Sequence, residues 1–201
     1  MKKIIFIPFL LISVCSVYCI AGRTDWIELN IFFGTYFCVL IGWIIYLKLK
    51  APDLLKERLT AGKKAKKFDR KVIPIYLFII FLFYATAAFD AGRLQFSTVP
   101  NILKIISFPI ILICFALSLW AGVTNKYLSS HVRIQTDRGH TVIETGPHRI
   151  VRHPMYTGIV ISYPFISLFL VSYFALVPAL MVIVLFIIRT SLEDKTLQNE
   201  L

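Results

Sequence analysis

Long apolar runs limit what this chain can fold into more than any other feature. A transmembrane helix needs about 20 mostly apolar residues, and the runs before residue 122 approach that length. Hydrophobic residues make up 58% of the chain and charged residues 16%, against about 45–50% and about 25% in soluble domains. We therefore expect an all-α, polytopic transmembrane helical protein whose N-terminal spans are Ile4–Ile20, Leu29–Leu47, Ile73–Phe89 and Ile102–Trp120.

The first run follows two lysines and also resembles a signal peptide. Its end contains the large residues Val17 and Tyr18, whereas a cleavage site needs small residues. We therefore expect this run to be retained as a first membrane helix.

The last apolar run, Ile159–Ile188, is too long for one simple span. As a single helix it would measure about 45 Å, against a hydrocarbon core of about 30 Å. Ser172 lies near its middle and Pro178 follows. We expect a helical hairpin, which returns Arg189 and Glu193 to the side where the run began. A single tilted helix would place them on the opposite side.

Basic residues determine the expected orientation. The net charge is +11, and the Lys and Arg residues lie in loops between apolar runs. This distribution favours topology signals and lipid-headgroup contacts over nucleic acid. The most basic loop, 48–71, is therefore expected in the cytoplasm, together with the N-terminus and segment 122–154. Within that loop, residues 52–59 are expected to form a short interfacial helix or a solvated loop.

A polar run interrupts the apolar C-terminal half between Gly146 and Gly158. Pro154 disfavours helix at His153 and suits the first turn of the helix that follows. Arg152, His153 and Tyr156 are then held at a helix entrance, where backbone N–H groups lack partners. Such a group can bind a polar ligand with aromatic and charged parts, or it can serve as an interfacial anchor.

Arg189 and Glu193 are four residues apart and share one face of a helix. They form either a surface ion pair worth about 0–1 kcal/mol or part of a ligand site. An Arg at the end of an apolar helix can simply extend to the membrane surface. It is equally suited to hold a carboxylate.

These motifs together resemble the isoprenylcysteine carboxyl methyltransferase family, whose relatives include the phospholipid N-methyltransferases. The family pattern is Gly-x-Tyr-x-x-x-Arg-His-Pro-x-Tyr-x-Gly, then a helical hairpin, then Arg-x-x-x-Glu. The resemblance extends from Ser129 to the C-terminus, and segments 52–59 and 90–93 are similar to bacterial members. It implies membrane helices over residues 1–122, a methyltransferase core over residues 123–201, and a place in a bacterial inner membrane.

The resemblance also implies S-adenosylmethionine as co-substrate. Arg189 matches the arginine that addresses the substrate carboxylate, and Glu193 matches the acidic residue beside the cofactor, so these two are the implied catalytic residues. His148 stands where the family usually has Tyr. The implied cofactor-binding residues are Gln135, His140, Thr141, Val142, Ile143, His148, His153, Pro154, Met155, Tyr156 and Glu193.

The implied chemistry is transfer of an activated methyl group by in-line displacement, which needs positioning rather than a metal. The acceptor is expected to be a lipophilic or lipidated carboxylate that enters from the bilayer. The remaining partners are membrane lipids, with no nucleic acid. Three alternatives stay open: a phospholipid or small-molecule methyltransferase acting on N, O or S, a sterol-reductase-like NADPH oxidoreductase, and a non-catalytic membrane scaffold.

Overall fold

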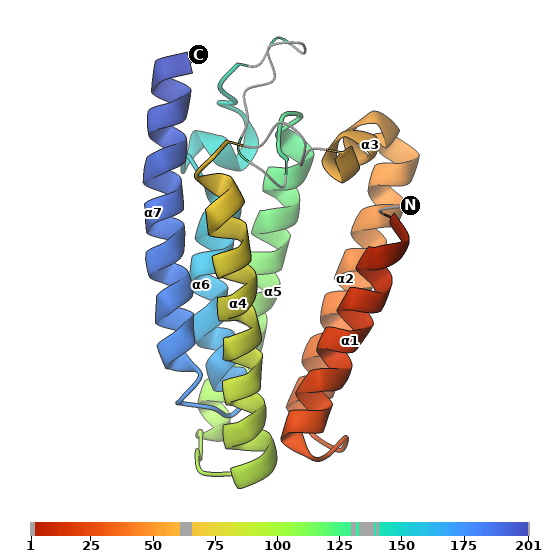
Figure 1. Ribbon diagram of the computed structural model, residues 1–201, viewed down its shortest axis with the longest axis vertical. Helices are drawn as coiled ribbons and strands as arrows, with labels where there is room; N and C mark the ends of the chain where they lie inside the picture. Colours follow the sequence, from red (N-terminus) through yellow and green to blue (C-terminus); the bar gives the residue numbers. More distant parts are fainter. Residues whose placement is uncertain (1–2, 61–65, 130–131, 133–138, 140, 201) are drawn as a thin grey trace.

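The computed structural model describes residues 3–60, 66–129, 132, 139 and 141–200. The described residues form helices and connecting segments and contain no strand, which confirms the all-α prediction. The long helices run side by side along the long axis of the molecule (Figure 1). In chain order the elements are α1 (Lys3–Ala21), α2 (Ile27–Lys50), α3 (Pro52–Thr60), α4 (Asp69–Ala87), the π-helix η2 (Ala88–Leu94), α5 (Asn101–Thr124), the 3-10 helix η4 (Gly146–Arg149), α6 (Pro154–Phe169) and α7 (Leu176–Glu200).

Every apolar run becomes helix, and several of the helices are long enough to cross a membrane. Among the described residues, four qualify by length and composition: Ile27–Lys50, Asp69–Leu94, Asn101–Thr124 and Leu176–Asn199. Leu11–Ala21 and Pro154–Phe169 are shorter apolar helices. Large apolar side chains such as Ile113 on α5 and Val184 on α7 are exposed, as expected where lipid covers the helices.

The C-terminal apolar run forms the expected hairpin. Helix α6 ends at Phe169 and α7 begins at Leu176, and a turn separates them. At Gly158 an added Cβ would lie 2.6 Å from the Ser118 Oγ and 2.8 Å from the Cys114 carbonyl oxygen. Only glycine therefore permits α6 to approach α5 this closely. The hairpin brings the end of α7 back beside the start of α6 (Figure 1).

A buried carboxylate fixes the hairpin turn to the end of α4. Asp90, in η2, is 3% exposed. Its oxygens accept hydrogen bonds from the Ser97 N–H at 3.1 Å, the Ser97 Oγ at 2.7 Å and the Ser172 Oγ at 2.6 Å. Ser172 lies in the α6–α7 turn. Because each buried donor would cost free energy without its acceptor, Asp90 holds the α6–α7 turn at the end of α4.

At the opposite end of the bundle, residues 52–60 form helix rather than loop. Arg58 of α3 donates to the Gly122 carbonyl at 2.6 Å and to the Leu128 carbonyl at 3.3 Å. Its guanidinium also lies 5.3 Å from the Trp43 ring centroid. Burial lowers the Arg58 pKa to about 10, so the side chain stays protonated at neutral pH. The charge faces the C-terminus of α5, where a helix dipole favours a cation.

One hydrophobic core connects all the long helices. It includes Phe32 of α2, Phe83 of α4, Ile111 of α5, Tyr163 of α6 and Phe186 of α7. The core takes residues from both sides of position 122, so the membrane helices and the C-terminal segment pack as one body. The functional division at residue 122 stays a prediction.

The Asp90 contacts predict the effect of Asp90→Asn. The variant keeps the shape of the side chain but replaces one acceptor oxygen by an amide donor. We expect the free energy of unfolding in detergent to fall by about 1–3 kcal/mol, because a buried donor loses its acceptor. Asp53→Asn, at an exposed position of α3, is the control and should unfold like the wild type. Equal stability of both variants would contradict the role given to Asp90.

Candidate active site

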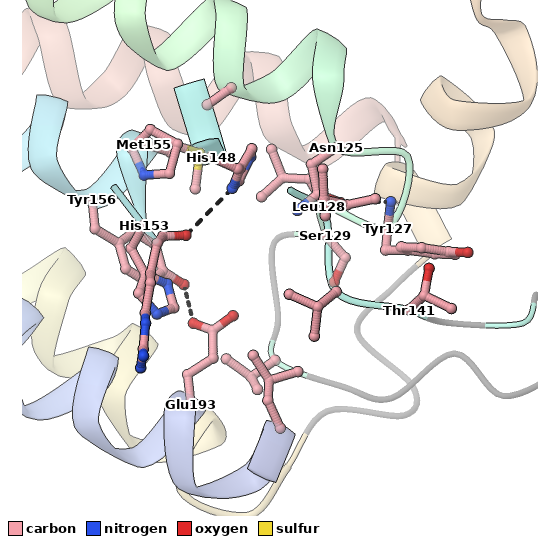
Figure 2. Close-up of a pocket in the computed structure, with 17 residues that line it drawn as sticks. Asn125, Tyr127, Leu128, Ser129, Thr141, His148, His153, Met155, Tyr156 and Glu193 are labelled. Atoms are coloured by element: carbon pink, nitrogen blue, oxygen red, sulfur yellow. Dashed lines mark hydrogen bonds between the residues drawn. The ribbon is translucent and has the colours of Figure 1, made fainter. Parts of the chain in front are cut away.

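A pocket (Figure 2) lies at one end of the bundle. Helix α3 and the end of α7 lie at the same end (Figure 1). Its walls come from the end of α5, the segment that follows α5, the start of α6, and α7. The residues that line it are Ala121, Asn125, Tyr127, Leu128, Ser129, Val132, Thr141, Val142, Ile143, His148, Arg152, His153, Pro154, Met155, Tyr156, Glu193 and Leu197.

The polar run folds as its glycine and prolines require. Gly146 has a φ of +58°, and a Cβ there would lie 2.7 Å from the Thr124 Oγ1. Both the backbone conformation and the lack of space therefore favour glycine at this position. His153 is non-helical, with φ −123° and ψ 65°, and Pro154 begins α6. Both features confirm the predicted helix start. The His153 and Tyr156 rings are parallel, 2° between planes and 5.4 Å between centroids.

Two neighbouring acids of α7 hold the start of α6. The Tyr156 hydroxyl donates to the Glu193 Oε2 at 2.7 Å (Figure 2). The His153 Nε2 lies 2.7 Å from the Asp194 Oδ1, and the Asp194 Oδ2 lies 3.9 Å from an exposed Arg152 guanidinium nitrogen. The hairpin therefore brings the two polar motifs together at one end of the molecule. The single tilted helix would have separated them.

Arg189 lies close to these residues but does not line the pocket. It is 8% exposed, and its Nη2 lies 3.0 Å from the Oδ1 of Asp69, which is fully buried. The guanidinium carbon is 5.2 Å from the Tyr156 ring centroid and 5.9 Å from that of Phe186. Tyr156 lines the pocket and Arg189 packs against it, with the Arg189 charge balanced by Asp69. The catalytic role implied for Arg189 stays a prediction.

His148 has a buried ring nitrogen without a hydrogen-bond partner among the described residues. The ring stands on the pocket wall (Figure 2), with its Nδ1 3.3 Å from the Arg152 carbonyl oxygen. Its Nε2 is buried and has no hydrogen-bond partner in the part of the chain that the structure describes. Because a buried polar atom without a partner costs free energy, this nitrogen is suited to contact a bound molecule.

The implied cofactor set and the pocket largely coincide. Thr141, Val142, Ile143 and every implied residue from His148 to Glu193 line the pocket. Gln135 and His140 lie outside the described residues.

Sequence reasoning missed several polar residues of the site. Asn125, Tyr127 and Ser129 line the pocket; the signal for them was a polar segment directly after an apolar span that was expected to end in the cytoplasm. Asp194, which follows Glu193, was given no role in the site. Asp69 lies in the loop that was singled out for its basic residues, and its local sequence gave no sign that it pairs with Arg189.

The pocket combines aromatic rings, the carboxylate of Glu193 and the exposed Arg152, which suits a ligand with an aromatic part and both signs of charge. Cations are favoured beside carboxylates and over aromatic faces. The described residues contain no group of three His, Cys, Asp or Glu that could hold a metal ion.

Comparison with known protein families finds a match to this part of the chain. Residues 105–199 match the model of the isoprenylcysteine carboxyl methyltransferase (ICMT) family. The match runs from α5 to α7 and contains every residue that lines the pocket. A search of curated proteins finds no match to the chain.

The link between α6 and α7 is testable by a double-mutant cycle. Tyr156→Phe combined with Glu193→Gln should show a coupling free energy of about 1–3 kcal/mol in unfolding, because the hydrogen bond joins a hydroxyl to a charged group. The control cycle combines Tyr156→Phe with Asp194→Asn. The Tyr156 hydroxyl bonds to Glu193 and not to Asp194, so this coupling should be clearly smaller. Equal coupling in both cycles would refute the assigned bond.

Proposed function

We propose, from the match of residues 105–199 to the model of the isoprenylcysteine carboxyl methyltransferase family, that the protein is an integral membrane, S-adenosylmethionine-dependent methyltransferase. Its acceptor is a lipophilic carboxylate. One observation carries the proposal: every described residue of the implied cofactor set lines a single pocket. Those residues come from segments that are distant in sequence, so their convergence on one pocket is a property of the fold.

The side chains of the pocket fit this co-substrate. When bound, S-adenosylmethionine supplies a methyl group activated by a sulfonium charge. The carboxylate of Glu193 favours positive charge at the α7 wall, and the rings of His153 and Tyr156 offer faces to cationic and aromatic groups. The buried Nε2 of His148 has no partner among the described residues and would form a hydrogen bond with the co-substrate. Arg152, at the rim, suits a ligand carboxylate.

Positioning is the main task that the protein has to perform. An acceptor carboxylate is already ionised at neutral pH, so its oxygen attacks without a general base. Tyr156, held by Glu193, presents a fixed ring and hydroxyl at the pocket wall. The Arg189 guanidinium, 5.2 Å from that ring, is the implied contact for an acceptor carboxylate, which would have to compete with Asp69 for it. Restricting both reactants to a reactive geometry supplies much of the rate enhancement in such a transfer.

The acceptor reaches the site from the bilayer, and membrane lipids are its neighbours. The pocket lies at the end of helices that are long and apolar enough to cross a membrane. At this same end lie the basic residues of α2, α3 and the start of α4. Under the positive-inside bias, this end faces the cytoplasm of a bacterial inner membrane. A water-soluble co-substrate and an apolar acceptor then meet at the membrane surface.

A second candidate is an N- or S-methyltransferase of the same superfamily that acts on a phospholipid or small molecule. The ion pair between Arg189 and Asp69 favours it, because Arg189 is already neutralised and so attracts an anion less strongly. The family match gives no support to the NADPH oxidoreductase or to the scaffold.

The acceptor class can be tested with methyl-tritiated S-adenosylmethionine and the purified protein in lipid nanodiscs. A prenylated cysteine derivative and a long-chain amine are offered as acceptors. We expect labelled product from the carboxylate, and we expect base to release the label as methanol, because only a methyl ester hydrolyses. Base-stable label from the amine would instead support the second candidate. Absence of transfer to either acceptor, together with absence of S-adenosylmethionine binding, would refute the proposal.

Arg189→Ala should reduce turnover of the carboxylate by about 100-fold, since misplacing a reactant by ~1 Å has an effect of that size. Turnover of an amine should change less. Arg149→Ala is the matched control, because Arg149 is exposed nearby and does not line the pocket. Equal losses in both variants would exclude a specific role for Arg189.

The orientation predicts which positions react with a membrane-impermeant maleimide in intact cells. The four native cysteines are first replaced by alanine. Thr24→Cys, in the α1–α2 loop, should then be labelled from outside, whereas Asp53→Cys in α3 should be labelled only after the cells are permeabilised. The reverse pattern would place the pocket outside the cytoplasm.

A further inference from the structure

Asp69 is the first residue of α4, and its carboxylate is fully buried. One oxygen, Oδ1, lies 3.0 Å from the Nη2 of Arg189. The other, Oδ2, accepts a hydrogen bond from the Val132 N–H at 2.8 Å. The Val132 carbonyl in turn accepts from the Lys66 N–H at 3.0 Å. One buried side chain thus joins the start of α4 to α7 and to the segment that follows α5.

Stability alone does not account for this arrangement. Burying two charges costs several kcal/mol per ion before their attraction is counted, and well-packed apolar residues often replace buried ion pairs without loss. The pair does impose geometry, because Arg189 can compensate the Asp69 charge only in a narrow range of positions. The main effect of Asp69 is therefore to fix the positions of Arg189 and Val132.

Both partners of Asp69 belong to walls of the pocket or support one. Val132 lines the pocket directly. Arg189 packs against the ring of Tyr156, and Tyr156 lines the pocket and donates to Glu193. Asp69 itself does not line the pocket. A change at Asp69 would therefore reach a bound molecule from two sides, through Val132 and through the group formed by Arg189, Tyr156 and Glu193.

We propose that Asp69 is a positioning residue of the methyl-transfer site, which sets the width of the cofactor pocket through its contacts with Arg189 and Val132. This inference rests on the proposed function, since it concerns the pocket that would hold S-adenosylmethionine. Residue 69 lies outside the segment that matches the family model, so the match does not assign it a role. Asp69 acts through its partners and touches no reacting atom.

The test is calorimetric binding of S-adenosylhomocysteine, the demethylated product, to the full chain in detergent. Asp69→Asn keeps an oxygen that can accept from the Val132 N–H but loses the charge that holds Arg189. Asp69→Ala loses both contacts. We expect Kd to rise about threefold for the first variant and about 30-fold for the second, as displacements of ~1 Å produce effects up to about 100-fold.

Asp90→Asn is the matched control, because Asp90 is also a buried acid but lies at the opposite end of α4. It should lower the Tm and leave Kd unchanged. The double variant Asp69→Asn with Arg189→Gln adds a readout that a purely structural role would not produce. Removing both charges should restore the Tm, while Kd stays weakened because no guanidinium remains beside Tyr156.

The outcomes separate the inference from the proposed function. If the wild type binds neither S-adenosylhomocysteine nor S-adenosylmethionine, the proposed function fails. If the wild type binds and the Asp69 variants bind equally well, the positioning role is overturned. It is also overturned if Asp90→Asn weakens binding as much as Asp69→Ala, or if Kd recovers with the Tm in the double variant.

Discussion

The antiparallel pairing of α6 with α7 is the constraint on which the rest of the site depends. Tyr156 and His153 begin one helix, and Glu193 and Asp194 lie near the end of the other, so the two polar motifs meet only if the chain reverses between them. Ser172 lies in the turn where the chain reverses. Its hydroxyl donates a hydrogen bond to the buried Asp90, which holds the turn in place at the far end of the bundle. Contacts at both ends of α7 therefore hold it beside α6, and those at the Glu193 end join two walls of the pocket.

The membrane explains why polar groups gather at the two ends. Within the hydrocarbon, backbone groups must bond internally, which leaves helices as the available structure for such runs. Polar side chains then have a low free-energy cost only at the ends of the helices, outside the hydrocarbon. Arg58 compensates the C-terminus of α5 at one end, and Arg93 donates to the last carbonyls of α1 at the other. The pocket lies at the end that holds most of the basic residues, where a charged, water-soluble molecule can reach it.

Features with local causes could be predicted from the sequence, and features with distant causes could not. The apolar runs and Pro154 determine helices and their start by length and backbone chemistry alone. The hairpin followed from a run too long for one crossing. In contrast, the helical state of residues 52–60 is fixed by Arg58 contacts with residues more than 60 positions away. The burial of Arg189 against Asp69 likewise depends on a pairing between distant segments. The cofactor set came from family resemblance, and the fold brings its described members together.

We propose that the pocket between α5, α6 and α7 holds S-adenosylmethionine. Ultraviolet cross-linking of methyl-tritiated S-adenosylmethionine to the purified protein, followed by peptide mapping, tests it most directly. We predict label on peptides that contain Thr141–Tyr156, and loss of that label when excess S-adenosylhomocysteine is present. Label that is absent, that survives the competitor, or that falls on α1 and the far end of α4 would contradict the claim.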